Sequence, residues 1–394
     1  MYTIGLDVHQ SRTSVCVLDG KGNTLRQEEV KGNYQAVAAH LAKLHHPFQV
    51  CYEASTGYGV LYDLLTPLAE KIQVAHPGRL ALIYKSKKKH NRADAQKLAS
   101  VMHLNQVPVV HVPKQEVRSW RGLIEHRRSL VDNSTAVKNQ IRALLRGQGI
   151  KGLPGRRQWT QAGLKWLGEQ KWPTAYEGLR LEILLEQLQD VQKKVARVTQ
   201  ALDQIANKHP GVRLLRTIAG VGPRTAEAFV AYVDDPSRFH SGAIGAYFGL
   251  VPREDSTGDY RHLGHITREG PPTVRKLVTE AAWRGAFKSA RIKAVYERIL
   301  KGDPGRKKLA IVATGHWLCR VMLAMLKTGE AFRELAPLAA AADGPSPEAT
   351  APAPARQVAE RNASSAAARV KKEPVKAARK RTAKAATKAG ALAQ

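Results

Sequence analysis

The sequence has 394 residues, of which 63 are Lys or Arg and 33 are Asp or Glu, so its formal net charge is +30. This length suggests about two or three domains, and the excess of positive charge favours a phosphate-bearing partner, because binding one releases counterions. The three cysteines, Cys16, Cys51 and Cys319, are widely spaced, which argues against a disulfide framework and a cysteine zinc site.

The first 75 residues have the pattern of an α/β domain. Loosely alternating or β-rich segments predict strands over 2–8, 13–18, 24–30, 48–52 and 72–75. Apolar residues at helical spacing predict helices over 34–44 and 61–71. Three meandering strands followed by alternating helix and strand favour a mixed α/β fold.

The middle of the chain is predicted to be helical. Helices are expected over 92–104 and 115–147, and the second carries many arginines. A looser stretch rich in Gly, Pro and Trp runs to residue 172 and precedes a heptad pattern, formed by Leu181, Leu184, Leu188, Val191, Val195, Val198, Leu202 and Ile205. This seam predicts a coiled coil, either between chains or within a hairpin. The alternative is one amphipathic helix packed on its own protein.

The chain ends in a second globular segment and a basic tail. The segment 212–334 is followed, after Pro337, by a composition dominated by Ala, Pro, Lys and Arg, which predicts a disordered nucleic-acid-binding arm. Residues 341–394 hold 11 Lys and Arg against 4 Asp and Glu, so most of the positive charge lies before the tail. We find no secretory signal or apolar run of membrane length and expect a cytoplasmic protein without a membrane partner.

Three acidic residues occupy positions at which an acid is unusual. Asp7 lies inside an apolar strand, Glu53 ends another strand, and Asp94 opens a basic helix. Buried acids are costly unless they are paired, hydrogen-bonded or bound to a metal. If these elements adjoin, the three acids predict a site for Mg²⁺ or Mn²⁺ that supports phosphoryl transfer. Alternatively, Asp94 complements the helix dipole and Asp7 is a satisfied core acid.

Two loops of the second segment suggest contact with phosphates. Gly220 and Gly222 lie between predicted helices, followed by Arg224, which resembles a helix-hairpin-helix DNA-binding motif. An ordinary helix–helix turn is the alternative. Further on, the hydroxyls of Ser256 and Thr257 precede Gly258, flanked by Arg253, Arg261 and Arg268. A hydroxyl needs a base or a metal to become a nucleophile, and from the residues alone a turn is the simpler interpretation of this loop.

Several ordered motifs resemble the IS110 family of transposases over about residues 1–335. The N-terminal motifs are Gly5-Leu6-Asp7-Val8-His9, Tyr52-Glu53-Ala54-Ser55-Thr56-Gly57 and Asn91-Arg92-Ala93-Asp94-Ala95-Gln96-Lys97-Leu98-Ala99. The C-terminal motifs are Ala219-Gly220-Val221-Gly222 and the segment from Gly249-Leu250-Val251-Pro252 to Gly270. The heptad helix stands where the family has a coiled coil.

The resemblance implies a fold and a division into domains. It implies a ribonuclease H-like (RuvC-like) α/β domain over 1–148 and a linker with coiled-coil helices over 149–210. A mostly α C-terminal transposase domain with the helix-hairpin-helix-like motif would follow over 211–336, and a disordered tail over 337–394.

The resemblance also implies an activity and its partners. The family excises and inserts an insertion sequence, using four metal-binding acids and a serine that links covalently to DNA. Its active sites are composite, assembled between protomers of a dimer or tetramer, and a structured RNA from the element is thought to guide DNA choice. A prokaryotic, nucleoid-associated location follows. Asp7, Glu53 and Asp94 would be the first, second and fourth acids.

The chain departs from the family pattern at two positions. Asn91 stands where the third acid is expected, and its side chain offers a metal a carbonyl oxygen without a charge. Thr257 stands where the family commonly has the nucleophilic serine, with Ser256 one residue earlier. Sequence register favours Thr257, whereas the less hindered primary hydroxyl favours Ser256. We rank Ser256 slightly first and keep both as candidates.

The sequence is compatible with three functions. The leading hypothesis is a DNA recombinase that moves its own element. The second is a RuvC-like, structure-specific nuclease that uses water and needs only the first domain. The third is a non-catalytic nucleic-acid-binding protein, which is motivated by Asn91.

Overall fold

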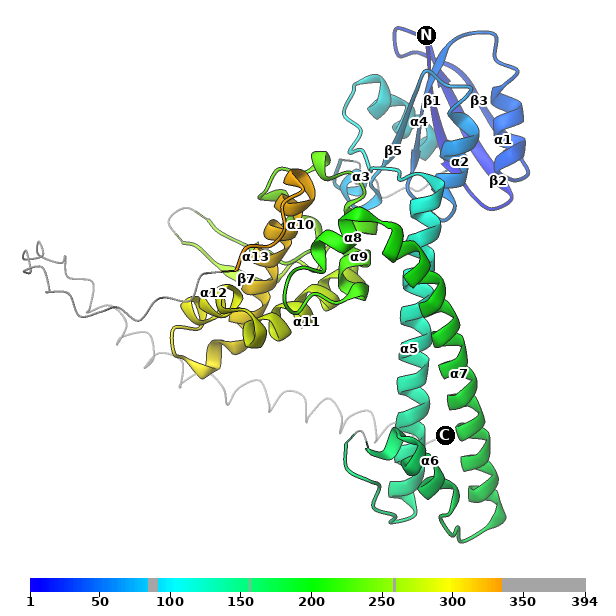
Figure 1. Ribbon diagram of the computed structural model, residues 1–394. Coiled ribbons are helices and arrows are strands. Elements are labelled where there is room, and N and C mark those ends of the chain that lie inside the picture. Colours follow the sequence, from blue (N-terminus) through cyan, green and yellow to red (C-terminus); the bar gives the residue numbers. More distant parts are fainter. Residues whose placement is uncertain (84–90, 156, 258–259, 335–394) are drawn as a thin grey trace, which may run out of the picture. The chain divides into compact units, whose positions relative to one another are not determined.

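The computed structural model describes residues 1–83, 91–155, 157–257 and 260–334 (Figure 1). The predicted disordered tail, 337–394, lies outside these residues, and so does Gly258 of the hydroxyl loop.

A five-stranded sheet forms the centre of the N-terminal region. Its strands are β1 (Tyr2–Val8), β2 (Arg12–Leu18), β3 (Thr24–Lys31), β4 (Phe48–Glu53) and β5 (Lys71–Ala75), in the order β3-β2-β1-β4-β5. The first three strands are antiparallel, whereas β4 runs parallel to β1 and β5 runs parallel to β4. The carboxyl ends of β1, β4 and β5 therefore meet at one edge of the sheet.

Helices cover both faces of this sheet. On one face, apolar side chains of α1 (Tyr34–Leu41) and α2 (Tyr58–Leu65) pack on alternate strand residues such as Ile4, Leu6 and Val50. On the other face, α4 (Asn91–His103) packs its small and apolar residues on the sheet. The short helix α3 (Pro77–Ile83) follows β5. This mixed α/β arrangement is consistent with the ribonuclease H-like domain that the sequence predicts.

The predicted strands all form, but the second predicted helix is too long. It was expected over 61–71, whereas α2 ends at Leu65 and β5 already begins at Lys71. Pro67 explains the early end, because it has no backbone N–H to donate the next helical hydrogen bond.

Two long helices lie side by side in the middle of the chain (Figure 1). They are α5 (Gln115–Gly147) and α7 (Ala175–Lys208), and the short helix α6 (Gln161–Gly168) lies between them in sequence. The heptad residues Leu181, Leu184 and Leu188 pack on Ile141 and Leu145 of α5. The apolar seam of α7 is thus partly covered by a helix of the same chain.

The C-terminal region is helical around one core. Its helices are α8 (Pro210–Leu215), α9 (Pro223–Val233), α10 (Ala243–Tyr247), α11 (Pro272–Lys288), α12 (Ala290–Leu300) and α13 (Lys307–Thr328), and its one described hairpin consists of β6 (Pro252–Glu254) and β7 (Leu263–Ile266). Phe229, Phe248 and Met322 are fully buried in this core. Trp120 and Ile124 of α5 join it.

One segment of the C-terminal region, Pro304–Thr328, is long and apolar enough to cross a membrane by length and composition alone. The sequence prediction of no such run overlooked it. Leu318, Cys319 and Met322 of this segment are buried in the core with α11 and α12. Such packing is what a core helix of a globular domain requires, so its apolar composition has an explanation within the fold.

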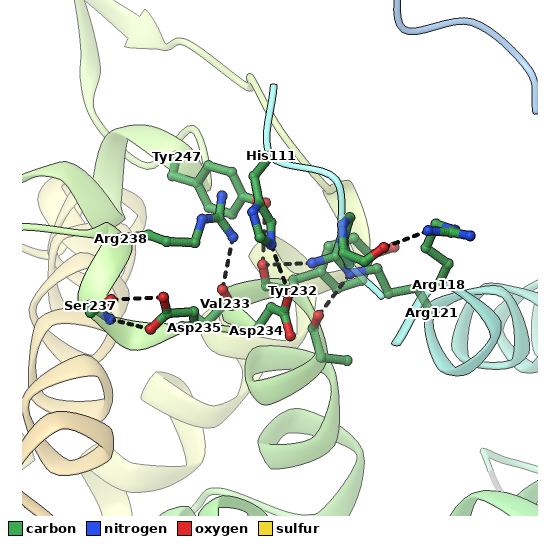
Figure 2. A network of polar contacts seen from close by, with 12 residues as sticks. His111, Arg118, Arg121, Tyr232, Val233, Asp234, Asp235, Ser237, Arg238 and Tyr247 are labelled. Carbon is green, nitrogen blue, oxygen red and sulfur yellow. Dashed lines mark hydrogen bonds and ion pairs between the residues drawn. The ribbon is translucent and has the colours of Figure 1, made fainter. Parts of the chain in front are cut away.

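A network of polar contacts connects the segment before α5 with the end of α9 (Figure 2). His111 Nε2 lies 2.7 Å from Asp234 Oδ2, and Arg121 Nε donates to the Ala231 carbonyl oxygen at 2.7 Å. Burial lowers the pKa of His111, against the opposing effect of Asp234. The last turn of α9 is therefore held by side chains on either side of the start of α5.

Candidate active site

Asp7 and Asp94 lie at the contact between β1 and α4. Asp7 is on β1, and Asp94 is in the first turn of α4. A Cβ atom on Gly5 would lie 2.0 Å from the Ala95 carbonyl oxygen and 2.4 Å from the Ala99 amide nitrogen. Only glycine therefore allows the helix backbone to approach the strand this closely. The approach brings Asp94 near enough for its charge to raise the pKa of Asp7.

The surroundings of Asp7 disfavour its ionised form. Burial is the largest cause of its raised pKa, and the negative charge of Asp94 adds to it. His9 opposes both, with its Nε2 atom 3.2 Å from Asp7 Oδ2. Two carboxylates that repel each other at a partly buried edge are a place where added positive charge is favourable.

Glu53 lies on the same edge of the sheet as Asp7. The parallel register pairs Leu6 of β1 with Tyr52 of β4, so the next residue of each strand is an acid. Glu53 is the last residue of β4 and is exposed. The prediction that these strands adjoin is therefore met by the topology of the sheet.

The fourth predicted ligand, Asn91, begins α4, and its side chain lies outside the described residues. Asp94 Oδ1 accepts a hydrogen bond from Lys97 Nζ at 2.7 Å. Within the described part of the chain, no three His, Cys, Asp or Glu side chains are grouped closely enough to hold a metal ion. The donors nonetheless fit a hard divalent cation in their chemistry, since they are carboxylate oxygens, and Asp7 and Asp94 repel each other.

The hydroxyl candidates lie on the exposed hairpin formed by β6 and β7. Ser256 Oγ donates a hydrogen bond to Glu254 Oε1 at 3.1 Å and accepts one from the His262 backbone N–H at 3.3 Å. Arg261 Nε donates to the same Glu254 oxygen at 3.0 Å. The Ser256 hydroxyl is thus oriented between a carboxylate and a backbone amide, close to a guanidinium group.

Thr257 is held differently from Ser256. Its backbone N–H and carbonyl pair with those of Tyr260, both at 3.1 Å, across the narrowest part of the hairpin. Both candidate residues are exposed. The hydrogen bond from its hydroxyl to a carboxylate distinguishes Ser256 from Thr257, and it favours Ser256 on chemical grounds.

The three arginines predicted to flank this loop are exposed. Arg261 is paired with Glu254. Among the described residues, Arg253 and Arg268 have no ion-pair partner, and Arg268 has a positive φ of 59° at the turn after β7. The hairpin therefore presents positive charge to solvent near the Ser256 hydroxyl.

The predicted glycine turn has a structural role. Gly220 has a φ of +98°, and a Cβ there would lie 2.5 Å from the Gly285 backbone nitrogen of α11. Glycine is therefore required for packing at this position, whether or not a phosphate binds. Gly222 precedes α9, and a Cβ there would meet no atom within 4 Å. Of the two glycines, Gly222 has the space that an approaching ligand needs.

Arg224, predicted to bind DNA, is largely engaged within the protein. Its side chain is 17% exposed, bonds to Asp203, and lies 3.2 Å from Glu227 Oε1. Glu227 is buried, and burial raises its pKa to about 7 against the opposing charges of Arg224 and Arg127. These groups line a cavity of about 390 Å³ between α5, α9 and α11.

Sequence reasoning missed two acids. Glu254 stands two residues before Ser256, and only the folded hairpin shows that the two side chains are hydrogen-bonded. Glu227 is flanked by alanines on an apolar helix face, and that position was the available signal of a buried acid.

The strand order and the acids at one edge of the sheet are consistent with a ribonuclease H-like domain, and the basic helical region is consistent with a nucleic-acid partner. Residues 4–149 match the DEDD model of IS110 transposases, and residues 212–297 match the model described as the transposase IS116/IS110/IS902 family. The two matched regions contain the candidate acids and the candidate hydroxyls, respectively.

Relatives support the same family. The chain is 30% identical over 288 residues to a putative transposase, y4qE, of Sinorhizobium fredii, covering 71% of this chain and 70% of the relative. It is 26% identical over 288 residues to the transposase for insertion sequence element IS1111A of Coxiella burnetii, covering 71% and 76%. The chain therefore belongs to the IS110 family of transposases, which are DNA-cleaving and recombining enzymes.

Proposed function

We propose that this transposase excises and inserts its own insertion sequence through a covalent link between Ser256 and DNA. The observation that carries the proposal is the hydrogen bond from Ser256 Oγ to Glu254 Oε1 on an exposed, basic hairpin. A serine hydroxyl is a weak nucleophile until a base accepts its proton, and Glu254 is in hydrogen-bonding contact to do so. Thr257 remains the second candidate.

The proposed step is a phosphoryl transfer from the DNA backbone to Ser256. Ser256 Oγ forms a bond to phosphorus while its proton passes to the Glu254 carboxylate, and one P–O bond of the DNA backbone breaks. The leaving deoxyribose oxygen takes up a proton. Strand exchange reverses the step, with a deoxyribose hydroxyl attacking the serine-linked phosphorus. Arg253 and Arg261 supply positive charge beside the phosphate.

We propose that Asp7, Glu53 and Asp94 hold Mg²⁺ or Mn²⁺, with Asn91 as a neutral oxygen donor. The support is the shared sheet edge of Asp7 and Glu53 and the charge interaction of Asp7 with Asp94. When bound, the cation would stabilise negative charge on the phosphate. His9 now contacts Asp7 and Lys97 contacts Asp94, and both side chains would have to move for a cation to bind.

We propose that the active site is composite and that the enzyme is a dimer or tetramer. Apolar residues Tyr176, Leu179 and Ile183 of α7 are exposed at helical spacing, which supports a coiled-coil contact with a second copy. Within the described residues, no hydrogen bond or ion pair joins Asp7 or Asp94 to the β6–β7 hairpin. A hairpin from one protomer meeting the acids of another would complete the site.

The remaining expectations belong to the same proposal. A structured guide RNA as a second nucleic-acid partner is supported by the family and by the net charge of +30. We also propose that the domains divide at residues 148, 210 and 336. Helix α5 would contribute to two of these domains, since its Trp120 and Ile124 pack in the C-terminal core. The tail would add nonspecific affinity for DNA at the nucleoid.

Excision of the intact element in cells tests the proposed function, with the circular junction scored by amplification. Wild type should form the junction, Asp7→Ala and Ser256→Ala should abolish it, and Asp255→Asn, a neighbouring exposed control, should retain it. Undiminished excision by Asp7→Ala would remove the metal-dependent mechanism. Survival of DNA hydrolysis in a Ser256→Ala, Thr257→Ala double variant would instead indicate a nuclease that uses water.

A further inference from the structure

Helix α11 presents an exposed aromatic and basic stripe. Lys276, Glu280, Trp283, Arg284 and Phe287 recur at helical spacing on its solvent face. Trp283 is 44% exposed and Phe287 is 76% exposed, and their ring centroids are 5.5 Å apart. Adjacent large aromatic rings left in solvent are a feature of binding surfaces more than of an ordinary helix exterior.

Beside this stripe lies a groove of about 660 Å³, here called the α11 groove, which extends from Ile266 and Arg268 past Trp283 to Ile311. Four of its lining residues are cations, Arg268, Arg275, Lys276 and Arg284, against one acid, Glu280. Among the described residues, the side chains of Arg268, Lys276 and Arg284 have no hydrogen-bond or ion-pair partner. Their charges are therefore available to an anionic ligand.

The positive charge in the α11 groove is concentrated. Arg275 donates to the Phe248 and Glu269 carbonyl oxygens at 3.0 and 2.9 Å, which fixes its guanidinium in the groove wall. Burial lowers its pKa, and the neighbouring positive charges of Arg268 and Arg128 lower it further. Cations that crowd each other in this way favour a bound anion, because the anion relieves their repulsion.

The α11 groove begins at the candidate active hairpin. Ile266, which lines the groove, is the last residue of β7, and Ser256 lies in the loop between β6 and β7. We propose that the α11 groove binds an unpaired DNA strand adjoining the cleavage site, with a base stacked on Trp283 and phosphates on Lys276 and Arg284. The choice of DNA rests on the proposed function, since Ile266 of the groove and Ser256 belong to the same hairpin.

The lining chemistry fits an unpaired strand better than a duplex. Bases in a duplex expose only their edges to the grooves, whereas an unpaired base offers its face to an aromatic ring. Trp283 lies in the lining beside the cations Lys276 and Arg284, so the groove offers a base a ring to stack on next to charges for the adjoining phosphates. Pro272, Ile266 and Ile311 supply further apolar surface for the bases.

The test is the affinity of the full-length protein for one labelled 20-nucleotide sequence, prepared as single-stranded DNA, duplex DNA and single-stranded RNA. Trp283→Ala should weaken single-stranded DNA binding roughly 5- to 150-fold, Trp283→Phe should restore most of it, and duplex binding should stay the same. Leu25→Ala, which removes an exposed apolar side chain of β3, is the control. Lys276→Gln with Arg284→Gln should reduce the logarithmic salt slope by about 1.4.

Equal losses for single-stranded and duplex DNA, a loss confined to RNA, or no loss at all would each overturn the proposal. A thermal unfolding scan separates a binding defect from loss of the packing between Trp283 and Tyr296, whose ring centroids are 6.1 Å apart. If Trp283→Ala does not fold, the double variant Lys276→Gln with Arg284→Gln decides the result. If Ser256 becomes linked to DNA but the Trp283 variants bind single-stranded DNA like wild type, only the proposed role of the α11 groove fails. If the Trp283 variants lose affinity but no link to Ser256 forms, only the proposed function fails.

Discussion

Burial raises the pKa of Asp7, and the negative charge of Asp94 raises it further across a contact in which α4 meets β1 with no side chain between their backbones. Gly5 makes this contact possible, so an unremarkable glycine in an apolar strand controls how closely two candidate metal ligands approach. The spacing between the acids therefore depends on helix–sheet packing and is open to test by substitutions away from the acids themselves.

Gly5→Ala should destabilise the protein and impair excision. The added methyl group overlaps the backbone of α4, so the helix must move outward, at a cost of about 1–3 kcal/mol. Urea unfolding and the excision assay measure the two effects. Gly122→Ala in α5 is the control, because a Cβ there meets nothing within 4 Å and a helical alanine should stabilise by about 0.5–1 kcal/mol.

Mn²⁺ binding should depend on the carboxylates of Asp7 and Asp94. Asp7→Asn and Asp94→Asn should each weaken binding by about tenfold or more, as followed by the free-ion signal in electron paramagnetic resonance, because each removes a charged oxygen donor. Asn91→Asp should strengthen it by adding a charge. Asp132→Asn on α5 provides a control acid away from the sheet, and equal binding by all variants would place the metal elsewhere.

Glu254→Gln should slow formation of the covalent protein–DNA link by about 10²- to 10⁴-fold, since glutamine can orient the Ser256 hydroxyl but does not accept its proton. The measurement is single-turnover reaction with a supercoiled donor plasmid, analysed on denaturing gels. Asp255→Gln changes the neighbouring exposed acid and should react at the wild-type rate. A wild-type rate for Glu254→Gln would leave the hydrogen bond without a role in catalysis.

Stability near neutral pH should depend on Glu227. Its folded pKa of about 7 exceeds the ordinary value of 4.5, so the folded chain keeps a proton that the unfolded chain releases. This group therefore stabilises the fold fully below about pH 4.5 and loses that contribution as the pH rises through about 7. Between about pH 5 and 8, Glu227→Gln should lose less unfolding free energy than wild type, by on the order of 2–3 kcal/mol. Exposed Glu280→Gln should follow wild type.

The sheet could be predicted because its signals are local. Alternation in β1, turn residues after Asp19 and the apolar run before Glu53 all act within a few residues. The position of Asp7 relative to Asp94 could not be predicted, because it depends on a backbone contact between Gly5 and α4, which begins at Asn91, 86 residues later in the chain. Nothing in the local pattern at Gly5 distinguishes a packing glycine from a turn glycine.

The surroundings of Arg224 could not be predicted from the local sequence. A basic residue after a glycine turn suggested a phosphate contact, but the fold turns it towards Asp203 and the buried Glu227. Burial of a glutamate is a tertiary property, and the sequence shows only that Glu227 stands among apolar neighbours. The role of Lys276 and Arg284 could not be predicted either, because charged residues are common on exposed helix faces and the sequence does not show the groove that they line.

Identification of the residue joined to DNA tests the covalent mechanism most directly. Wild-type protein is incubated with a donor plasmid that carries the element ends and with Mg²⁺, the covalent product is digested with nuclease and protease, and the modified peptide is sequenced by mass spectrometry. A phosphodiester remnant is expected on Ser256, and none is expected in the Ser256→Ala variant. A remnant on Thr257 would transfer the nucleophile to its neighbour, and DNA cleavage without any protein-linked product would contradict the covalent mechanism.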